Sequence, residues 1–398
     1  MKQSIVFLLV LTNSGRYFKV YLDNRRFTLT DINDTIICRN HGLHTLQPCL
    51  NHTVQLLAAI PIKPEEIMKK ILLITTGGTI ASELTNEGLA PSTNSEGLEA
   101  FIGAVTTEYD VEVEDLFQLD SSNIQPEEWQ SIARTIAREV KNFDGIVLTH
   151  GTDTMAYTAS VLSFMLRNLP IPVVITGSQL PISHPLTDGV KNLRCAFAMA
   201  ASEKTGVYIA FDRKVILGTR AVKVRTTGFN AFESVNCPNA ATVDAGGLML
   251  NEAVLPRING DFILEDRLSN GVFLIKLTPG LNPEIFDMLS NMNYKGIVIE
   301  AFGAGGLNFV RRDLISKLQR VVECGISVVV CSQCLYERSD FTIYQAGQKA
   351  LKTGVLQGLD MTTEAAVTKL MWALGKTENP EEIKHIFATN YVGEINLT

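Results

Sequence analysis

The sequence lacks the features that would assign it to several large classes of protein. None of its apolar runs approaches the about 20 residues that a membrane-spanning helix needs. Lysine and arginine total 35 against 42 aspartates and glutamates, a net charge of -7, so the basic surface of a nucleic-acid-binding protein is not expected. We therefore predict neither a membrane nor a nucleic-acid partner.

Cysteine is also scarce, and its 7 residues are too scattered for a disulfide framework. Cys331 and Cys334 have CxxC spacing, but they follow three valines and have no second pair, which favours buried thiols at a strand end over a zinc or redox site. A second set of potential ligands matches no standard zinc spacing; it comprises Cys38, His41, His44, Cys49 and His52. The sequence has no glycine-rich phosphate-binding motif either. We predict no metal and no cofactor.

Residues 1–67 differ from the rest of the chain because they show no clear periodicity. Lys2 precedes a short apolar run, Ile5 to Leu11, which hints at a signal peptide, but no small-x-small cleavage site follows the run. Met68 and two lysines then open a strand directly, as a true N-terminus would. We hypothesise that 1–67 is an extension from an upstream start codon and is dispensable for the fold of the remainder.

From Met68 onward, apolar runs alternate with helical patterns, which indicates an α/β fold with helices on both faces of a parallel sheet. A chain of 398 residues is expected to form two domains. We predict a larger N-terminal parallel-sheet domain at 68–255, a polar linker at 256–270 and a smaller C-terminal α/β domain at 271–398. The polar stretch 82–92 is predicted to be a mobile loop, either a lid over a site or a plain surface loop.

The stretch from Ile71 to Ala81 combines a predicted buried strand with a glycine turn. Four apolar residues predict a strand that is buried on both faces, and Gly77 and Gly78 allow a sharp turn after it. Thr79 follows at the carboxyl end of this strand, where open α/β sheets bind their ligands. An isolated threonine at this position is most simply a turn cap, and the alternative is a nucleophile.

Polar side chains also follow other predicted strands, and the carboxyl ends of parallel strands share one edge of a sheet. These residues are Ser121, Ser122, Thr152, Asp153 and Ser178, with Lys223 after a further pair of strands. Hydroxyls, a carboxylate and an amine suit acyl transfer, which needs a nucleophile, a base and donors for an oxyanion. Taken singly, Asp153 could be a helix cap, Lys223 a surface lysine and His150 a core residue, so these alternatives stay open.

Two longer motifs resemble the signature segments of the L-asparaginase family: Thr76 to Ala81 (TGGTIA) and His150 to Met155 (HGTDTM). Four shorter motifs are similar to the bacterial type I, cytoplasmic branch of that family: Asp120-Ser121-Ser122, Ala156 to Ser160, Thr176 to Gln179, and Asp360-Met361-Thr362. The resemblance covers about Met68 to the C-terminus and excludes residues 1–67. It implies a two-domain asparaginase-like fold, a cytoplasmic location, and a homodimer or homotetramer.

The resemblance also implies an activity and a set of site residues. The activity would be hydrolysis of L-asparagine to L-aspartate and ammonia through an acyl-threonine intermediate on Thr79. Thr152, Asp153 and Lys223 would form the second catalytic set, with Lys223 polarising the Thr152 hydroxyl. The substrate would be bound by Asp120, Ser121, Ser122, Thr152, Asp153 and Ser178.

The chain departs from the family pattern at two positions. Family members often carry a tyrosine in the lid that activates the nucleophile, and Leu89 stands at the corresponding position. Lys223 would then act more directly, or another tyrosine would substitute. Some type I enzymes are activated by asparagine through an arginine, and Glu300 stands at what looks like that position, although Cys334 fits another part of the site. We do not expect that form of allostery.

Three functions stay open. The first is a free L-asparaginase. The second is the asparaginase-like component of an archaeal-type tRNA-dependent amidotransferase, which would have a strand-rich N-terminal extension; residues 1–67 show too little alternation for one. The third is a non-enzymatic amino-acid sensor. The intact set of Thr79, Thr152, Asp153 and Lys223 argues against it, because binding alone needs no nucleophile.

Overall fold

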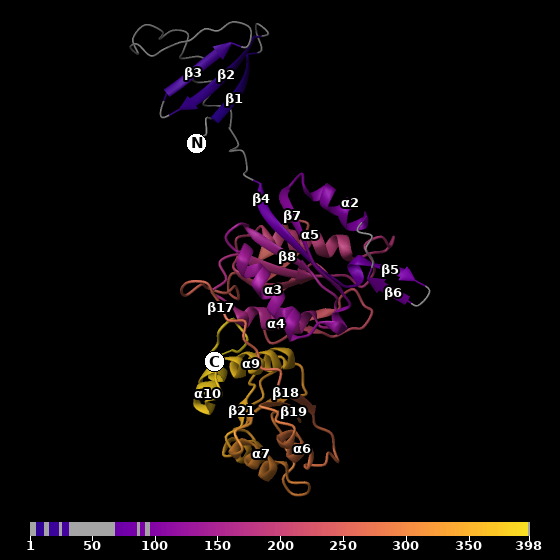
Figure 1. Cartoon of the computed structure of the whole chain (residues 1–398), viewed down its shortest axis with the longest axis vertical. Coiled ribbons are helices and arrows are strands. Elements are labelled where there is room, and N and C mark those ends of the chain that lie inside the picture. The colour runs from indigo at the N-terminus through magenta and orange to yellow at the C-terminus, as the bar shows by residue number, and fades with distance from the viewer. Residues whose placement is uncertain are drawn as a thin grey trace. The chain divides into compact units, whose positions relative to one another are not determined.

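The computed structural model describes residues 5–11, 16–23, 26–31, 68–85, 88–91 and 96–396. The chain forms two compact units, Met1–Ile67 and Met68–Thr398 (Figure 1). Each is described by itself. Within the described residues, no helix is long and apolar enough to cross a membrane.

The first unit contains a three-stranded antiparallel sheet, so the expectation of little strand structure in 1–67 is wrong. Its strands are β1 (Ile5–Leu11), β2 (Arg16–Asp23) and β3 (Arg26–Asp31), in the order β1-β2-β3. The apolar run that hinted at a signal peptide is strand β1. The signal in β3 is the alternation of Phe27 and Leu29 with polar residues, and only two residues separate β2 from β3, the spacing of a short hairpin.

The second unit is built on an eight-stranded sheet in the order β16-β15-β12-β11-β10-β8-β4-β7. Its strands are β4 (Lys69–Gly77), β7 (Tyr109–Leu119), β8 (Gly145–Thr149), β10 (Pro172–Thr176), β11 (Gly206–Phe211), β12 (Lys214–Leu217), β15 (Ala241–Asp244) and β16 (Gly247–Leu250).

The predicted parallel sheet is correct for five of these strands, and the sheet as a whole is mixed. Strands β11, β10, β8, β4 and β7 are parallel, whereas β12, β15 and β16 continue the sheet antiparallel. The change of direction occurs at Asp212 and Arg213, which link β11 to β12 with φ values of 47° and 61°. Two consecutive residues with positive φ form the tight turn that matches the twist of a hairpin.

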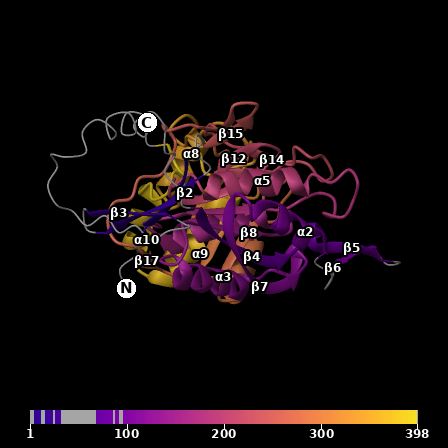
Figure 2. The same ribbon diagram turned by 90° about the horizontal axis from the view of Figure 1, so that it is seen from above.

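Helices cover both faces of this sheet, because its central strands are apolar on both sides. On one face, Leu72 and Ile74 of β4 belong to the core formed with α3 (Pro126–Glu139) and α4 (Met155–Met165). On the other face, Ile71 and Leu73 belong to the core formed with α2 (Glu96–Val105) and α5 (Gly189–Ala200). Both views show α3 and α5 on opposite sides of β8 (Figures 1 and 2).

A second, smaller sheet is parallel throughout and has the order β18-β19-β20-β21. Its strands are β18 (Val272–Lys276), β19 (Gly296–Ala301), β20 (Ser327–Ser332) and β21 (Leu356–Gln357). Helices α6 (Ile285–Asn291) and α7 (Leu314–Glu323) pack on one face, and α9 (Thr363–Lys376) and α10 (Pro380–Ala388) pack on the other. Helix α8 (Gln345–Leu351) precedes β21.

Helices α4 and α9 join the two sheets' layers (Figure 1). The rings of Phe164 in α4 and Trp372 in α9 stack with centroids 5.7 Å apart. The hydroxyls of Ser160 and Thr368 form a buried hydrogen bond of 2.9 Å between the same helices. Strand β17 (Ile263–Leu264), within the predicted linker, pairs with β9 (Leu166–Arg167). The predicted boundaries at 255 and 271 stay a prediction.

Two short hairpins lie beyond the sheets. Strands β5 (Ser82–Thr85) and β6 (Gly88–Pro91) pair antiparallel, so the stretch predicted to be a loop is a hairpin that projects from the side of the larger sheet's domain in both views (Figures 1 and 2). Strands β13 (Ala221–Lys223) and β14 (Phe232–Ser234) form the second hairpin.

Candidate active site

Backbone contacts between glycines bring three strand ends together. Gly78, with φ 81°, follows β4, and a Cβ atom added to it would lie 2.4 Å from the Gly151 nitrogen after β8. A Cβ atom on Gly151 would in turn lie 2.6 Å from the Ser121 hydroxyl after β7. The Gly78 N–H donates to the carbonyl of Leu119 at 3.0 Å. Because Gly78 and Gly151 have no side chains, the loops that carry Thr79, Thr152 and Ser121 are immediate neighbours.

Thr79 begins η1 (Thr79–Ala81), a single 3-10 turn at the carboxyl end of β4. The turn is anchored on both sides: the Ser82 hydroxyl donates to the Gly78 carbonyl at 2.8 Å, and the carbonyl of the buried Ile80 accepts the Ile182 N–H at 3.2 Å. Thr79 itself is only partly buried. The turn thus presents a hydroxyl at the strand end, as predicted, on a backbone that is fixed.

Lys223, at the end of β13, makes the charged contacts of the site. Its Nζ atom lies 2.8 Å from the Thr152 hydroxyl oxygen and 2.5 Å from Oδ1 of Asp153. The lysine side chain is 17% exposed, and that of Asp153 is 64% exposed. The predicted set of Thr152, Asp153 and Lys223 is therefore assembled in space, although β13 lies outside the main sheet.

Gln179 is a neighbour of this set. It belongs to the motif Thr176 to Gln179, but it was not predicted to be a site residue. Its side-chain N–H groups donate to the carbonyls of Thr226 and Gly228 at 3.2 and 3.1 Å. This leaves its Oε1 atom to accept a hydrogen bond from the Thr152 hydroxyl, with 3.4 Å between the two oxygens. The signal that could have found it is its position just beyond the end of β10.

Asp120 and Ser122 are bound to each other rather than to Thr152. Asp120 caps η2 (Ser121–Asn123), and its Oδ1 atom accepts both the N–H and the hydroxyl of Ser122, at 2.8 and 2.5 Å. These hydrogen bonds from Ser122 lower the pKa of the Asp120 carboxyl. Ser121 is buried, and its hydroxyl accepts the Asp153 N–H at 3.2 Å. The turn therefore holds Ser121 against the loop after β8.

Ser178 is buried at the end of β10, and its hydroxyl donates to the Leu180 carbonyl at 2.5 Å. The following backbone is held by the Asp188 carboxylate, which accepts the N–H groups of Gln179 and Leu180 at 3.0 and 3.2 Å. Asp188 also accepts from the Asn192 side chain at 3.0 Å. The Ser178 side chain therefore serves the local turn.

His150 is a core residue. It is fully buried, its Nδ1 atom faces the Gly151 carbonyl at 2.6 Å, and its Nε2 atom faces the Thr158 hydroxyl at 2.9 Å. A carbonyl only accepts, so Nδ1 must carry the proton and Nε2 accepts from Thr158, which in turn accepts from Trp129 at 2.9 Å. Burial lowers the pKa of His150 to about 4.

The other predicted features fall outside this site. Cys331 is buried and Cys334 exposed, both as free thiols. Glu300 accepts the Thr363 hydroxyl at 2.7 Å and lies 3.3 Å from the Lys276 ammonium. The side chain of Leu89 and the cysteines and histidines of 38–52 lie outside the described residues. Across those that are described, no three His, Cys, Asp or Glu side chains are grouped as metal ligands.

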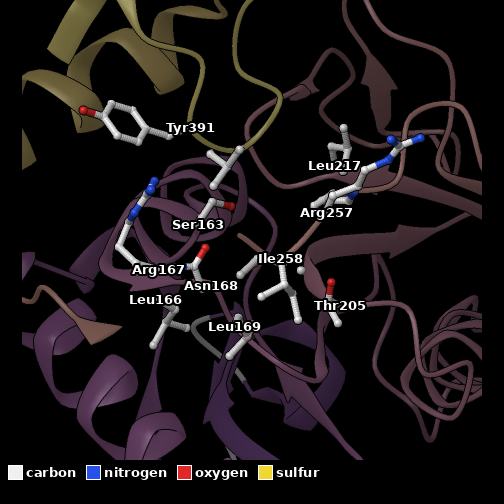
Figure 3. Close-up of a pocket in the computed structure, with 14 residues that line it drawn as sticks. Ser163, Leu166, Arg167, Asn168, Leu169, Thr205, Leu217, Arg257, Ile258 and Tyr391 are labelled. Atoms are coloured by element: carbon white, nitrogen blue, oxygen red, sulfur yellow. The ribbon is translucent and has the colours of Figure 1, made fainter. Parts of the chain in front are cut away.

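One cavity lies apart from these residues (Figure 3). Arg167 and Asn168 after α4, Thr205 before β11, and Pro256–Ile258 bound it, and none of its lining residues is a predicted site residue. It opens near the amino end of β11, whereas the assembled polar residues follow the carboxyl ends of β4, β7, β8 and β10. The candidate site is therefore the cluster of polar residues at the carboxyl edge of the sheet.

The chain is similar to known proteins over most of its length. Two protein-family models match the chain: Asparaginase, N-terminal, at residues 70–255, and Glutaminase/Asparaginase C-terminal domain at 271–387. An L-asparaginase of Thermococcus kodakarensis is 43% identical over 328 residues, 82% of this chain and 99% of that protein. The solved structure of the thermostable L-asparaginase from the same organism has a TM-score of 0.78 and covers 83% of this chain and 100% of its own.

Two further relatives have different names, one an amidotransferase and the other an L-asparaginase. A glutamyl-tRNA(Gln) amidotransferase component from Pyrococcus abyssi is 37% identical over 340 residues, 82% of this chain and 77% of that protein. The structure of L-asparaginase I from Vibrio cholerae is 30% identical, with a TM-score of 0.75, and covers 83% of this chain and 100% of its own. The bacterial type I resemblance is thus accompanied by close archaeal relatives of both kinds.

Proposed function

We propose, because the chain belongs to the asparaginase family, that this amidohydrolase is an L-asparaginase that converts L-asparagine to L-aspartate and ammonia. The observation that carries the proposal is the position of the Lys223 ammonium, 2.8 Å from the Thr152 hydroxyl and 2.5 Å from the Asp153 carboxylate. A lysine that contacts one threonine hydroxyl, beside a turn that carries a second threonine, can activate a hydroxyl oxygen as a nucleophile. A site that only binds its ligand needs no such lysine.

In the proposed mechanism, the Thr79 hydroxyl oxygen attacks the side-chain amide carbon of asparagine and gives up its proton. The tetrahedral intermediate collapses as the C–N bond breaks, and the departing nitrogen takes a proton and leaves as ammonia. Water then attacks the threonine ester, which releases aspartate and restores the hydroxyl. Thr152, with Lys223 behind it, takes the proton that Thr79 gives up and returns it to the departing nitrogen, and it does the same for the proton of the attacking water.

Substrate binding is assigned to the loops after β7, β8 and β10. In our proposal Asp120, Ser121 and Ser122 bind the α-carboxylate and the amino group of the substrate, and Asp153 helps to bind the amino group. The Asp153 carboxylate is 64% exposed, which leaves it open to a second cation besides Lys223. The main chain at Ser178 faces the side-chain amide. Clamping the α-groups fixes how far the amide carbon reaches toward Thr79.

Ammonia release by the purified protein tests the activity and its selectivity together. We expect turnover of L-asparagine and a preference over L-glutamine, because one additional methylene moves the carbonyl by more than an ångström, and a displacement of that size costs on the order of 100-fold in rate. Equal kcat/KM for asparagine and glutamine would contradict the proposal that the α-groups of the substrate are held in a fixed position. Absence of any turnover of asparagine would remove the proposal itself.

A second candidate function is favoured by a specific observation. Amidotransferase components are among the relatives, and the first unit of this chain contains an antiparallel sheet. The chain would then deliver ammonia to a partner protein that acts on a charged tRNA. Hydrolysis of free asparagine by the isolated chain favours the first candidate; ammonia release that appears only with a partner and its tRNA favours the second.

We also propose a homodimer or homotetramer in the cytoplasm without cofactor. The resemblance to type I enzymes suggests the assembly and location, and the free state of all five cysteines among the described residues suits a reducing compartment. Light scattering measures the assembly, and a monomer with full activity would contradict it. Activity that a chelator removes and a divalent ion restores would contradict the absence of a metal.

A further inference from the structure

Lys223 lies three residues after Arg220, a charged side chain that is fully buried. Nη1 of Arg220 donates to Oδ2 of Asp360 at 2.9 Å and to the Asp360 carbonyl at 3.0 Å. Its Nε atom donates to the Gly393 carbonyl at 2.6 Å. Removing one partner of a buried ion pair leaves an uncompensated charge, so the Arg220 side chain is tied to these two acceptor residues.

Both acceptors belong to or contact one segment, Tyr391–Asn396, which we call the C-terminal clasp. Oε1 of Glu394 accepts from Nζ of Lys369 at 2.7 Å, and neither side chain is exposed. The Asn396 N–H and side chain donate to the two carboxylate oxygens of Asp360, at 3.0 and 2.6 Å. The Arg167 guanidinium stands 4.3 Å from the Tyr391 ring centroid, and Figure 3 shows it directed toward that ring.

The same contacts reach the hairpin that carries Lys223. The Arg220 carbonyl accepts the Val235 N–H at 2.8 Å, which closes the base of the β13–β14 hairpin. The Asn236 side chain donates to the Asp360 carbonyl at 3.0 Å, and the Asn236 carbonyl accepts from the Asn396 side chain at 2.9 Å. Asn396 and Asp360 therefore hold the first strand through Arg220 and the second strand through Asn236.

We propose that the C-terminal clasp is a positioning element for the reaction, with Asn396 and Asp360 fixing the hairpin so that Lys223 reaches Thr152 and Asp153. This inference rests on the proposed function of Lys223. A lysine side chain has a flexible four-carbon stem, so its placement depends on where the backbone holds its Cα atom. Displacements of an ångström at a catalytic group cost on the order of 100-fold in rate, and a partial loosening costs less.

A pair of asparagine variants tests the proposal. Asn396→Ala removes the side chain that joins Asp360 to Asn236. Asn379→Ala is the matched control, because Asn379 caps α10 by accepting the N–H groups of Glu381 and Glu382 and makes no contact with Arg220 or Asp360. At a temperature below both melting points, we expect Asn396→Ala to lower kcat by roughly tenfold with little change in KM. The control should lower only the melting temperature.

Hydrogen exchange provides a readout that does not depend on the substrate. Asn396→Ala should accelerate exchange of the backbone amides in 220–235, including the Val224 N–H that donates to Ala231 at 2.8 Å, while Asn379→Ala should leave them protected. If the wild type does not hydrolyse asparagine, the proposed function fails and the exchange data still test the clasp. Unchanged exchange or unchanged kcat in Asn396→Ala, or equal effects in the control, would overturn the positioning role.

Discussion

Gly78 and Gly151 pack backbone against backbone, so closely that a methyl group on Gly78 would lie 2.4 Å from the Gly151 nitrogen. Gly78 precedes Thr79, and Gly151 precedes Thr152. The contact therefore sets the separation of the two threonine turns without any side chain between them. Glycine is needed at position 78 for this closeness and for the positive φ, and at position 151 because a Cβ atom there would lie 2.6 Å from the Ser121 hydroxyl oxygen.

Replacing Gly78 by alanine should inactivate and destabilise the protein. The new methyl group would collide with Gly151, and a residue other than glycine at φ 81° and ψ 179° adds about 1–3 kcal/mol of strain. Gly103→Ala is the matched control: it lies exposed in α2, and nothing stands within 4 Å of its added Cβ atom. Turnover and urea unfolding of both variants test this; normal turnover in Gly78→Ala would contradict the packing.

Removal of either threonine hydroxyl should abolish turnover with little effect on aspartate binding. Thr79→Ala deletes the attacking atom, and Thr152→Val deletes the oxygen that Lys223 contacts at 2.8 Å. Residues that act as a unit are not additive, so the double variant should be hardly worse than either single one. If both threonines only cap turns, each substitution should lower the free energy of unfolding by about 1 kcal/mol and leave the activity intact. A Thr79→Ala protein with near-normal turnover would refute the mechanism.

Gln179→Met should lower kcat by about tenfold, the cost of one lost hydrogen bond to a group in the reacting set. Methionine has a similar length, but it cannot donate hydrogen bonds to the Thr226 and Gly228 carbonyls, and its sulfur is only a weak acceptor for the Thr152 hydroxyl. Gln319→Met on the exposed face of α7 is the control and should behave as wild type. Steady-state kinetics on both variants decide, and an unaffected kcat in Gln179→Met would remove Gln179 from the site.

His150 should make the fold less stable as the pH falls from 6.5 to 4. The unfolded histidine binds a proton below its ordinary pKa near 6.5, whereas the buried one does so only at about 4. Between these values the unfolded state holds the additional proton, so acid favours unfolding by roughly 3 kcal/mol at pH 4 relative to pH 7.

Unfolding free energies measured from pH 7 to pH 4 test this prediction. The His150→Gln variant should have a lower free energy of unfolding at every pH. It should also lose this part of the pH dependence, because no imidazole remains to be protonated. His385→Gln is the control, since His385 is exposed at the end of α10. An unchanged slope in His150→Gln would show that other groups dominate acid unfolding.

The fragment Met68–Thr398 should fold and keep its activity without residues 1–67. It forms a compact unit with both sheets, and the first unit has its own strands. We expect soluble protein with wild-type kcat/KM for asparagine. An insoluble or inactive fragment would show that 1–67 contributes to the fold or the site.

The sequence was sufficient for the elements whose signals are local. Strand β4 and the turn at Gly78 lie where the stretch from Ile71 to Ala81 predicts them, because apolar runs and glycines act within a few positions. The sequence reasoning missed β1–β3 and the hairpin β5–β6. In those stretches short alternations compete with turn formers, and pairing between strands decides the outcome.

What the sequence determined by itself is the chemistry at the strand ends: a glycine turn before Thr79, hydroxyls at Ser121 and Thr152, and a carboxylate at Asp153. Only the tertiary structure decided which of these groups meet. Lys223 reaches Thr152 from a hairpin outside the main sheet, Gln179 joins them from a third loop, and Arg220 ties that hairpin to Asp360 and Gly393. Such contacts join residues from 27 to 173 positions apart, and no local pattern records them, because they arise when packed layers bring distant loops to one edge.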